Sequence, residues 1–288
     1  MEITDKNKKR RENRETFLYA KYKAYTLNQL IPLLFKKNSL TRQAAIFRLQ
    51  IIGTDEVFTF AVNLCQSEGK QERKTGISIL SQLSMSPEHL TQSFNLVEAL
   101  LEKETSANVR AAAVNAIGHF CRRNPSFNSR APELLTRTTY DKSVNTRCAT
   151  AAALSEINNI KAIPLLLSLL NDSNGDVRNW AAFSVNTNEY DSKEIREAFV
   201  KMLSDDHEHA RLEAIFGLAE RKDSRVVKTI INELEKDIIF DELIVVAGDL
   251  GSKRFLPVLK KLLSEFNDEK TIGKIKIAIQ KITSPYEF

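Results

Sequence analysis

The sequence predicts an all-α, right-handed solenoid of about eight helix pairs with an N-terminal capping helix. Three observations predict it: only 9 glycines and 7 prolines occur in 288 residues, apolar residues make up 42%, and an arginine-centred pattern recurs along the chain. Few helix breakers and few alternating apolar–polar runs favour helices over sheets. A period of about 30–40 residues, held over most of a chain, is typical of stacked repeats.

The recurring pattern places one arginine ahead of small and apolar residues at helical spacing. The stretch DVRNWAAFSV carries Arg178, and its copies carry Arg42, Arg73, Arg110, Arg147 and Arg211, at successive intervals of 31, 37, 37, 31 and 33 residues. A further copy, IIFDELIVVAGDLG, has Asp241 or Glu242 near the place of the arginine. A second amphipathic segment precedes each copy, for example 162–172 and 195–206. The repeating unit is therefore a helix, a polar turn and a second helix.

The elements follow in a simple order along the chain. Residues 1–15 are expected to form a basic, disordered tail, and 16–25 a capping helix that covers the open end of the first repeat with Tyr19, Tyr22 and Tyr25. The repeat array is expected over 26–283 and a short tail over 284–288. Prolines at 32, 164 and 257 are expected near the start of the first helix of their repeats, where proline is tolerated best.

The arginines of the row are expected to be structural. Each lies in the first turn of a helix, where a cation gains nothing from the helix dipole. The predicted partner is a carboxylate or carbonyl of an adjacent turn, so that Arg42, Arg73, Arg110, Arg147, Arg178 and Arg211 form a ladder of charge-assisted hydrogen bonds. Six equivalent arginines do not make one catalytic site. Asp176 is expected to cap its helix or to lie near the positive helix end.

Charge is distributed unevenly. Residues 1–25 hold eight basic and four acidic side chains, whereas the remaining body holds 34 basic and 33 acidic ones, and residues 189–242 hold nine basic and fifteen acidic ones. A nearly neutral body argues against a long groove that follows nucleic-acid phosphates. The interpretation is that nucleic acid is not the partner of the array.

The sequence contains no recognisable catalytic or metal-binding motif. Its three cysteines share no ligand spacing, which fits a reducing compartment, and no secretory signal precedes the array. His207 and His209 are expected to be a solvated surface pair. The prediction is a cytoplasmic, non-enzymatic protein with no cofactor and no metal.

The VR-x-x-A-A cores at 109–113 and 177–182 resemble the HEAT-like repeat family, in the short form found in phycobilisome lyase subunits. No feature for handling a bilin is present, so lyase activity is not expected. The stretches at 138–147, 170–183 and 218–227 resemble the YibA-type HEAT proteins encoded beside enterobacterial Rhs toxin genes. That resemblance implies an immunity protein that binds the C-terminal toxin domain of its cognate Rhs protein and covers its active or substrate-binding surface.

Two alternatives remain open for the function. One is a scaffold or adaptor for another protein or RNA. The other is a DNA binder like the DNA-alkylation glycosylases, which place tryptophan and aspartate on a basic HEAT-like surface; here Trp180 is the only tryptophan, and the region after it is acidic.

The candidate partner surface lies on consecutive second helices. By analogy with other copies, Val177, Ala181, Ser184 and Val185 are expected in the core. Large aromatics beside acids then suit a hot spot for a basic protein; the alternative is that these aromatics fill space between helices. The candidate residues are Asn179, Trp180, Phe183, Leu212, Glu213, Phe216, Glu220, Asp241 and Glu242.

Overall fold

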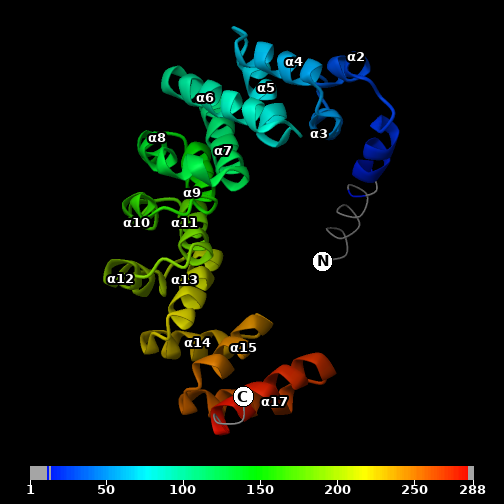
Figure 1. Cartoon of the computed structure of the whole chain (residues 1–288). Coiled ribbons are helices and arrows are strands. Elements are labelled where there is room, and N and C mark those ends of the chain that lie inside the picture. Colours follow the sequence, from blue (N-terminus) through cyan, green and yellow to red (C-terminus); the bar gives the residue numbers. More distant parts are fainter. Residues whose placement is uncertain (1–11, 13, 285–288) are drawn as a thin grey trace. The chain divides into compact units, whose positions relative to one another are not determined.

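The computed structural model describes residue 12 and residues 14–284. This part of the chain is helical without strands (Figure 1). It divides into two compact units, unit 1 (Met1–Asn159) and unit 2 (Ile160–Phe288). The predicted tails at 1–15 and 284–288 lie mostly outside the described residues. Each unit is described by itself below.

Unit 1 contains the first four helix pairs. In order, its helices are α2 (Leu27–Leu30) with a 3-10 turn (Ile31–Leu33), α3 (Ser39–Ile52), α4 (Asp55–Cys65), α5 (Lys70–Gln82), α6 (Pro87–Lys103), α7 (Ala107–Arg123), a 3-10 turn (Pro125–Ser129), α8 (Ala131–Thr139) and α9 (Val144–Leu154).

Unit 2 contains four further pairs. Its helices are α10 (Ile163–Leu169) after a 3-10 turn (Ile160–Ala162), α11 (Gly175–Thr187), α12 (Lys193–Met202), α13 (Glu208–Glu220), α14 (Val227–Leu234) after a 3-10 turn (Ser224–Val226), α15 (Asp241–Leu250), α16 (Leu256–Glu265) after a 3-10 turn (Lys253–Phe255), and α17 (Glu269–Thr283).

The helices alternate between two layers within each unit. In unit 2, Figure 1 shows the second helices α11 and α13 stacked in one column, and the first helices α10 and α12 beside them. The described part of the chain contains eight pairs, from α2–α3 to α16–α17. The predicted all-α solenoid is therefore confirmed.

The core between the layers uses the positions that the repeat pattern predicts. Val177, Ala181, Ser184 and Val185 are all fully buried, which confirms the expected register of α11. Small residues let the second helices approach closely: a Cβ added to Gly118 of α7 would lie 3.0 Å from the Cα atom of Ala153 in α9. The stack thus fixes which stripe of each second helix faces the core and which faces outward.

The described residues of the N-terminal helix are 12 and 14–22, so this helix ends three residues before the predicted end at residue 25. Tyr22 is buried and its ring lies 5.0 Å from that of Tyr25, while the ring of Tyr19 lies 5.0 Å from that of Phe47 in α3. The helix therefore contacts the first repeat through Tyr19, one of the three tyrosines that the sequence singled out.

Pro32 is not near the start of a helix, in contrast to the prediction. It follows the four-residue α2 and lies inside the 3-10 turn Ile31–Leu33. Proline has no N–H to continue the α-helical hydrogen-bond pattern, and the predicted helix over 27–37 is therefore cut short. Pro164 and Pro257 do lie in the first turns of α10 and α16, as predicted.

Candidate functional site

All six arginines of the row turn one nitrogen back onto their own inter-helix turn. In each, Nη1 donates to the main-chain carbonyl six residues earlier. The distances are 2.6 Å (Arg42 to Lys36), 3.1 Å (Arg73 to Ser67), 3.3 Å (Arg110 to Glu104), 2.8 Å (Arg147 to Asp141), 2.8 Å (Arg178 to Asp172) and 2.6 Å (Arg211 to Asp205). The arginine therefore closes the turn that precedes its helix.

Hydrogen bonds to a carboxylate in the next repeat are seen for Arg73, Arg110, Arg178 and Arg211. Three use Nε and Nη2 together, which matches the two oxygens of a carboxylate, and the fourth uses Nε. The pairs are Arg73–Glu104 (2.7 and 3.0 Å), Arg110–Asp141 (2.7 and 2.9 Å), Arg178–Asp205 (2.6 and 2.6 Å) and Arg211–Glu233 (2.9 Å). Arg42, at the first repeat, bonds only carbonyls within the described part of the chain.

The sequence analysis did not identify the acidic partners of the arginines, although a repeated position in the sequence marks them. An acid stands six residues before the next arginine at Glu104, Asp141, Asp172 and Asp205. Each of these carboxylates also accepts from a main-chain N–H two residues later, at 2.8–2.9 Å. Each of these acids therefore closes its own turn. The carboxylates of Glu104, Asp141 and Asp205 also bind the arginine of the preceding repeat.

The pairing lowers the pKa of the carboxylates. Hydrogen bonds from Arg73 are the main cause of the lowered pKa of Glu104. Burial raises the pKa of Asp205, but hydrogen bonds from Arg178 and from the main-chain N–H of His207 outweigh it and hold that pKa below its ordinary value. These acids therefore stay ionised in the folded protein at neutral pH.

The turn before α11 shows how two repeats are joined. Asn174 is the N-cap, and its side chain accepts from the N–H groups of Asp176 and Val177 at 3.0 and 3.2 Å. Asp176 is therefore not the cap but lies near the positive helix end, the other role expected for it. Of the predicted solvated pair, His209 is exposed, whereas His207 is half-buried and bonded. The Nδ1 of His207 accepts from Ala210 N–H as the N-cap of α13, and its Nε2 lies 3.2 Å from Asp176 Oδ1.

The partner candidates on α11 do face outward. Trp180 and Phe183 are both about 40% exposed, and their rings meet edge to face with centroids 5.7 Å apart. Asn179 is half-buried beside them. Exposed aromatics in contact offer a large, rigid apolar surface to a partner.

Leu212 is wrongly predicted as a partner residue. It is buried, as are Ile215 and Ala219, which follow it at the i, i+3, i+7 spacing of a helical stripe. This stripe lies on the flank of α13, where the stacked second helices cover it. The next stripe is less buried: Glu213 and Phe216 are half-buried, and Glu220 is exposed.

Glu213 is a half-buried member of that stripe. Its carboxylate accepts from Asn186 Nδ2 at 3.0 Å. Burial raises the pKa of Glu213, and the nearby charge of Glu220 adds to the rise, while the Asn186 hydrogen bond opposes it. Glu213 therefore helps to join α11 to α13 and is poorly suited to meeting a partner as a free charge.

A groove brings together three of the predicted candidates. It has a volume of about 510 Å³, and Phe216 and Glu220 of α13 and Glu242 of α15 line it. Val245 of α15 is also in its wall and is 40% exposed. Asp241 does not take part as a free acid, because its Oδ2 accepts from Lys274 Nζ of α17 at 2.9 Å.

Equivalent positions of three consecutive second helices form a pattern on this face, hereafter the second-helix face. Its middle row is apolar, and the rows on either side carry acids. The rows are Trp180, Glu213 and Glu242; Phe183, Phe216 and Val245; and Thr187, Glu220 and Asp249. An apolar row flanked by carboxylates is suited to a partner surface with apolar anchors and basic neighbours.

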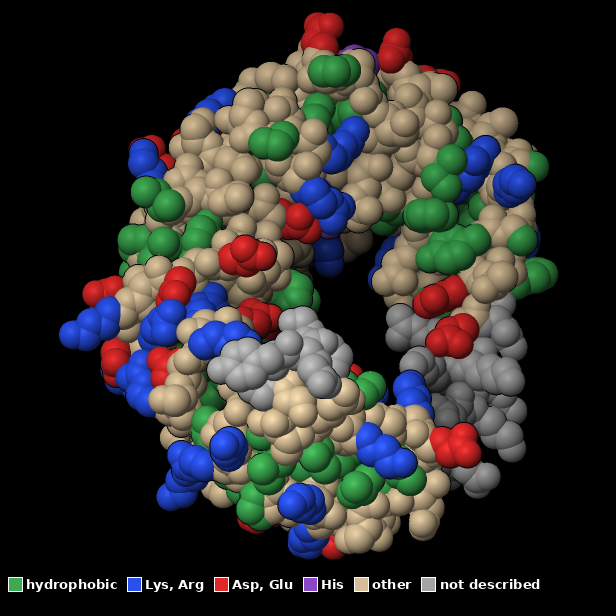
Figure 2. All heavy atoms as spheres, turned by 60° about the horizontal axis from the view of Figure 1, so that its bottom comes forward, with side chains coloured by type: hydrophobic (Ala, Val, Ile, Leu, Met, Phe, Trp, Pro, Cys, Tyr) green, Lys and Arg blue, Asp and Glu red, His purple; other side chains and the backbone are tan. Residues whose placement is uncertain are grey.

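The acidic part of the second-helix face ends where α17 begins to contribute lysines. Lys274 and Lys281 of α17 pair with Asp241 and Asp249 at 2.9 and 2.7 Å. Figure 2, which brings this end of the molecule forward, shows Lys and Arg side chains spread among hydrophobic ones. The exposed carboxylates Glu220 and Glu242, by contrast, form no ion pair with any residue that the structure describes.

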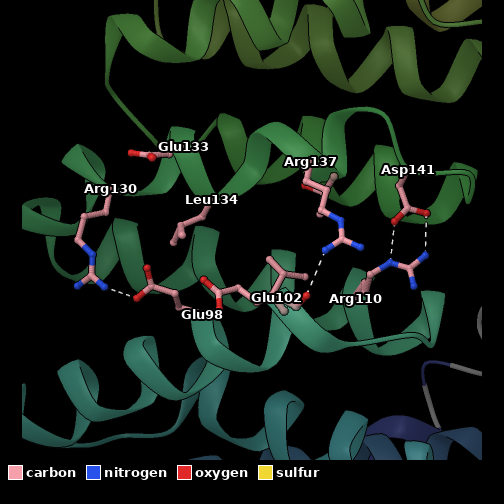
Figure 3. Close-up of a pocket in the computed structure, with 10 residues that line it drawn as sticks. Glu98, Glu102, Arg110, Arg130, Glu133, Leu134, Arg137 and Asp141 are labelled. Carbon is pink, nitrogen blue, oxygen red and sulfur yellow. Dashed lines mark hydrogen bonds and ion pairs between the residues drawn. The ribbon is translucent and has the colours of Figure 1, made fainter.

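A second pocket, of about 440 Å³, lies in unit 1 between α6 and α8. Figure 3 shows Arg130 directed to Glu98 and Arg137 donating to the carbonyl of Glu102, while the ladder pair Arg110–Asp141 closes one side. Most charges of this pocket are thus engaged in joining neighbouring helices.

The described residues offer little for chemistry. Burial raises the pKa of the Cys65 and Cys121 thiols to about 12, with the charge of Glu156 adding to the effect at Cys121, which makes both poor nucleophiles. Within residue 12 and residues 14–284, no group of three or more His, Cys, Asp and Glu side chains is arranged to hold a metal ion. In the same part of the chain, no helix combines the length and hydrophobicity needed to cross a membrane.

The chain is similar to known proteins built from HEAT repeats. A family model described as HEAT repeats matches residues 95–186. Protein YibA of Escherichia coli strain K12 is 40% identical over 264 residues, which cover 92% of this chain and 94% of YibA, and YibA of Escherichia coli O157:H7 gives the same values. The X-ray structure of Escherichia coli YibA superposes with a TM-score of 0.85 at 39% identity, covering 94% of this chain and 97% of the other.

Proposed function

Because the chain belongs to the family of HEAT-repeat proteins that includes Escherichia coli YibA, we propose that it is an immunity protein. It binds the C-terminal toxin domain of a cognate Rhs-family toxin in the cytoplasm and covers the active or substrate-binding surface of that domain. The resemblance to the YibA-type HEAT proteins implies the class of partner. Membership of the family supports the HEAT-repeat fold and does not identify the partner.

The observation that carries the proposal is the second-helix face of unit 2. Repeat packing requires only small or apolar residues on the buried stripes, yet the outward stripes carry the exposed Trp180 and Phe183 and the half-buried Phe216. Exposed aromatics at the centre of a surface, with charged residues at its edge, are typical of binding hot spots. This distribution supports a surface that binds another protein, and a purely structural array would not need it.

The charges support a basic partner. Glu220 and Glu242 flank the apolar row and are free of ion pairs within the described part of the chain. A toxin domain that acts on nucleic acid carries a basic active face, and an acidic surface speeds its encounter and competes with its substrate. Aromatic anchors then slow dissociation. The mechanism is stoichiometric occlusion, with no chemical step.

The test is to search the neighbouring genes for an Rhs-type reading frame and to co-express the chain with the C-terminal domain that this frame encodes. We expect restored growth, and a stable complex of the two purified proteins. Growth that stays arrested, together with no complex at micromolar concentrations, would contradict the proposal. A complex in which the toxin stays fully active would instead support the adaptor alternative.

Nucleic-acid binding should depend on the tail alone. Deleting residues 1–14, which hold six basic and three acidic side chains, should abolish any weak binding of duplex DNA or RNA at physiological salt, because the body is almost neutral. Fluorescence anisotropy of full and truncated chains over a salt series measures this. Salt-dependent binding that persists in the truncated chain would favour the RNA-adaptor or glycosylase-like alternative.

A further inference from the structure

The groove on the second-helix face combines an apolar floor with two carboxylates. Phe216, Ala219, Val245 and Val246 supply the floor between α13 and α15, and Glu220 and Glu242 supply one carboxylate from each helix. A long side chain with an apolar stem and a cationic end matches both parts, because its stem can cover the floor while its charge reaches the acids.

The cations of the groove are already engaged. Lys274 Nζ lies 2.9 Å from Asp241 Oδ2, and Lys222 Nζ donates to the main-chain carbonyl of Asp249 at 2.8 Å. Neither lysine forms an ion pair with Glu220 or Glu242. The two carboxylates therefore remain available to an incoming cation, which would offset part of the cost of removing them from water when a partner covers the face.

We infer that this groove receives an arginine side chain of the partner, an assignment that rests on the proposed function for the identity of the partner. A guanidinium has five N–H donors, so it can bond more than one carboxylate at once, and it has a flat face that stacks on an aromatic ring. A lysine ammonium lacks the flat face. The same chain uses this contact elsewhere: the guanidinium carbon of Arg221 lies 5.4 Å from the ring centre of Phe199, and that of Arg130 lies 5.1 Å from the ring centre of Phe94. Phe216 is the corresponding ring in the groove.

The first experiment does not need the toxin. Nα-acetyl-arginine methylamide is titrated into the isotope-labelled full-length chain and followed by NMR, with the lysine analogue and the neutral, isosteric citrulline analogue as comparators. We expect saturable shifts of α13 and α15 amides in the millimolar range, with binding of the citrulline analogue at least about tenfold weaker. Equal binding of the citrulline analogue, or no saturable shift with the arginine analogue, would overturn the inference.

The second experiment uses a variant and a charge-matched control. Glu220→Gln combined with Glu242→Gln should abolish the arginine-analogue shifts and weaken toxin binding about tenfold or more. Glu235→Gln combined with Asp237→Asn removes the same charge from exposed positions before α15 and should change both by less than about twofold. Circular dichroism checks folding.

The two experiments separate the proposals. If the arginine analogue binds in the groove but the toxin domain does not bind the chain, the groove assignment stands and the immunity function fails. If the toxin domain binds tightly while the analogue and the paired variant show no effect, the immunity function stands and the groove assignment is overturned.

Discussion

Replacing Asp205 with alanine should lower the free energy of unfolding by about 2–4 kcal/mol. Asp205 accepts two hydrogen bonds from Arg178 at 2.6 Å and one from the main-chain N–H of His207 at 2.9 Å. The substitution leaves Arg178, whose side chain is only 15% exposed, without its main partner. Removing one member of a buried ion pair costs about 3–5 kcal/mol, and partial exposure reduces that value. Urea unfolding of the full chain measures it.

The neighbouring Asp206 is the matched control. It also contacts Arg178, at 3.1 Å, but its side chain is 96% exposed, so Asp206→Ala should change the free energy of unfolding by no more than about 0.5 kcal/mol. Equal losses for the two variants would show that the ladder bond of Asp205 is not what stabilises the stack.

The pH dependence gives a second check on Asp205. Because its pKa is lowered in the folded state, its stabilising effect is present above the ordinary pKa of about 3.9 and is lost as pH falls through the lowered value. The difference between the original chain and Asp205→Ala should therefore stay constant from about pH 7 to 5 and shrink below about pH 4. A difference that grows as pH falls would contradict this sign.

Replacing Trp180 with alanine should weaken binding of the toxin domain by about 2 kcal/mol or more, which is at least about a 30-fold rise in Kd. Trp180 is 41% exposed and is the only tryptophan of the chain, and its ring is supported by Phe183. The loss should appear mainly as faster dissociation, because aromatic anchors act after encounter. Surface-based kinetics with the purified toxin domain measures both rate constants.

Tyr140 provides the control for this substitution. It is an aromatic of unit 1 with 69% exposure in the turn between α8 and α9. Tyr140→Ala should leave both rate constants within about twofold, with circular dichroism confirming the folding of both variants. If Tyr140→Ala weakens binding while Trp180→Ala does not, the interface lies on unit 1 and the second-helix face is not the binding surface.

The fold was largely predictable because it is repeated locally. Each second helix carries its own stripe of small and apolar residues, and the stripe of α11 predicted its four core positions correctly. Helix pairing follows from the same stripes, since each must be covered by a neighbour. The prediction for Pro32 was wrong because the apolar pattern of residues 27–37 did not define where the helix begins. A proline is tolerated in the first turn of a helix but interrupts the helix further along.

The candidate site was only partly predictable. The sequence placed Trp180, Phe183, Phe216 and Glu220 among the outward residues, but it did not separate Leu212 from them. One residue along a helix turns the side chain by about 100°, so a residue beside an exposed position can lie on a buried flank. The stacking of neighbouring second helices decides which flank is covered.

By itself, the sequence determined the helix pairs, the arginine row and the chemical class of its partners, because these depend on periodicity and on the charge of one side chain. The tertiary structure decided which acid each arginine binds: the arginine and its acid are 31, 31, 27 and 22 residues apart in the four pairs, although three of these acids share a position six residues before the next arginine. It also decided that Asp241 is neutralised by Lys274 whereas Glu220 and Glu242 share a groove. The physical reason is that first helices and turns of different length intervene, so the number of residues between an arginine and its acid varies, and the packing of neighbouring repeats decides which of them meet.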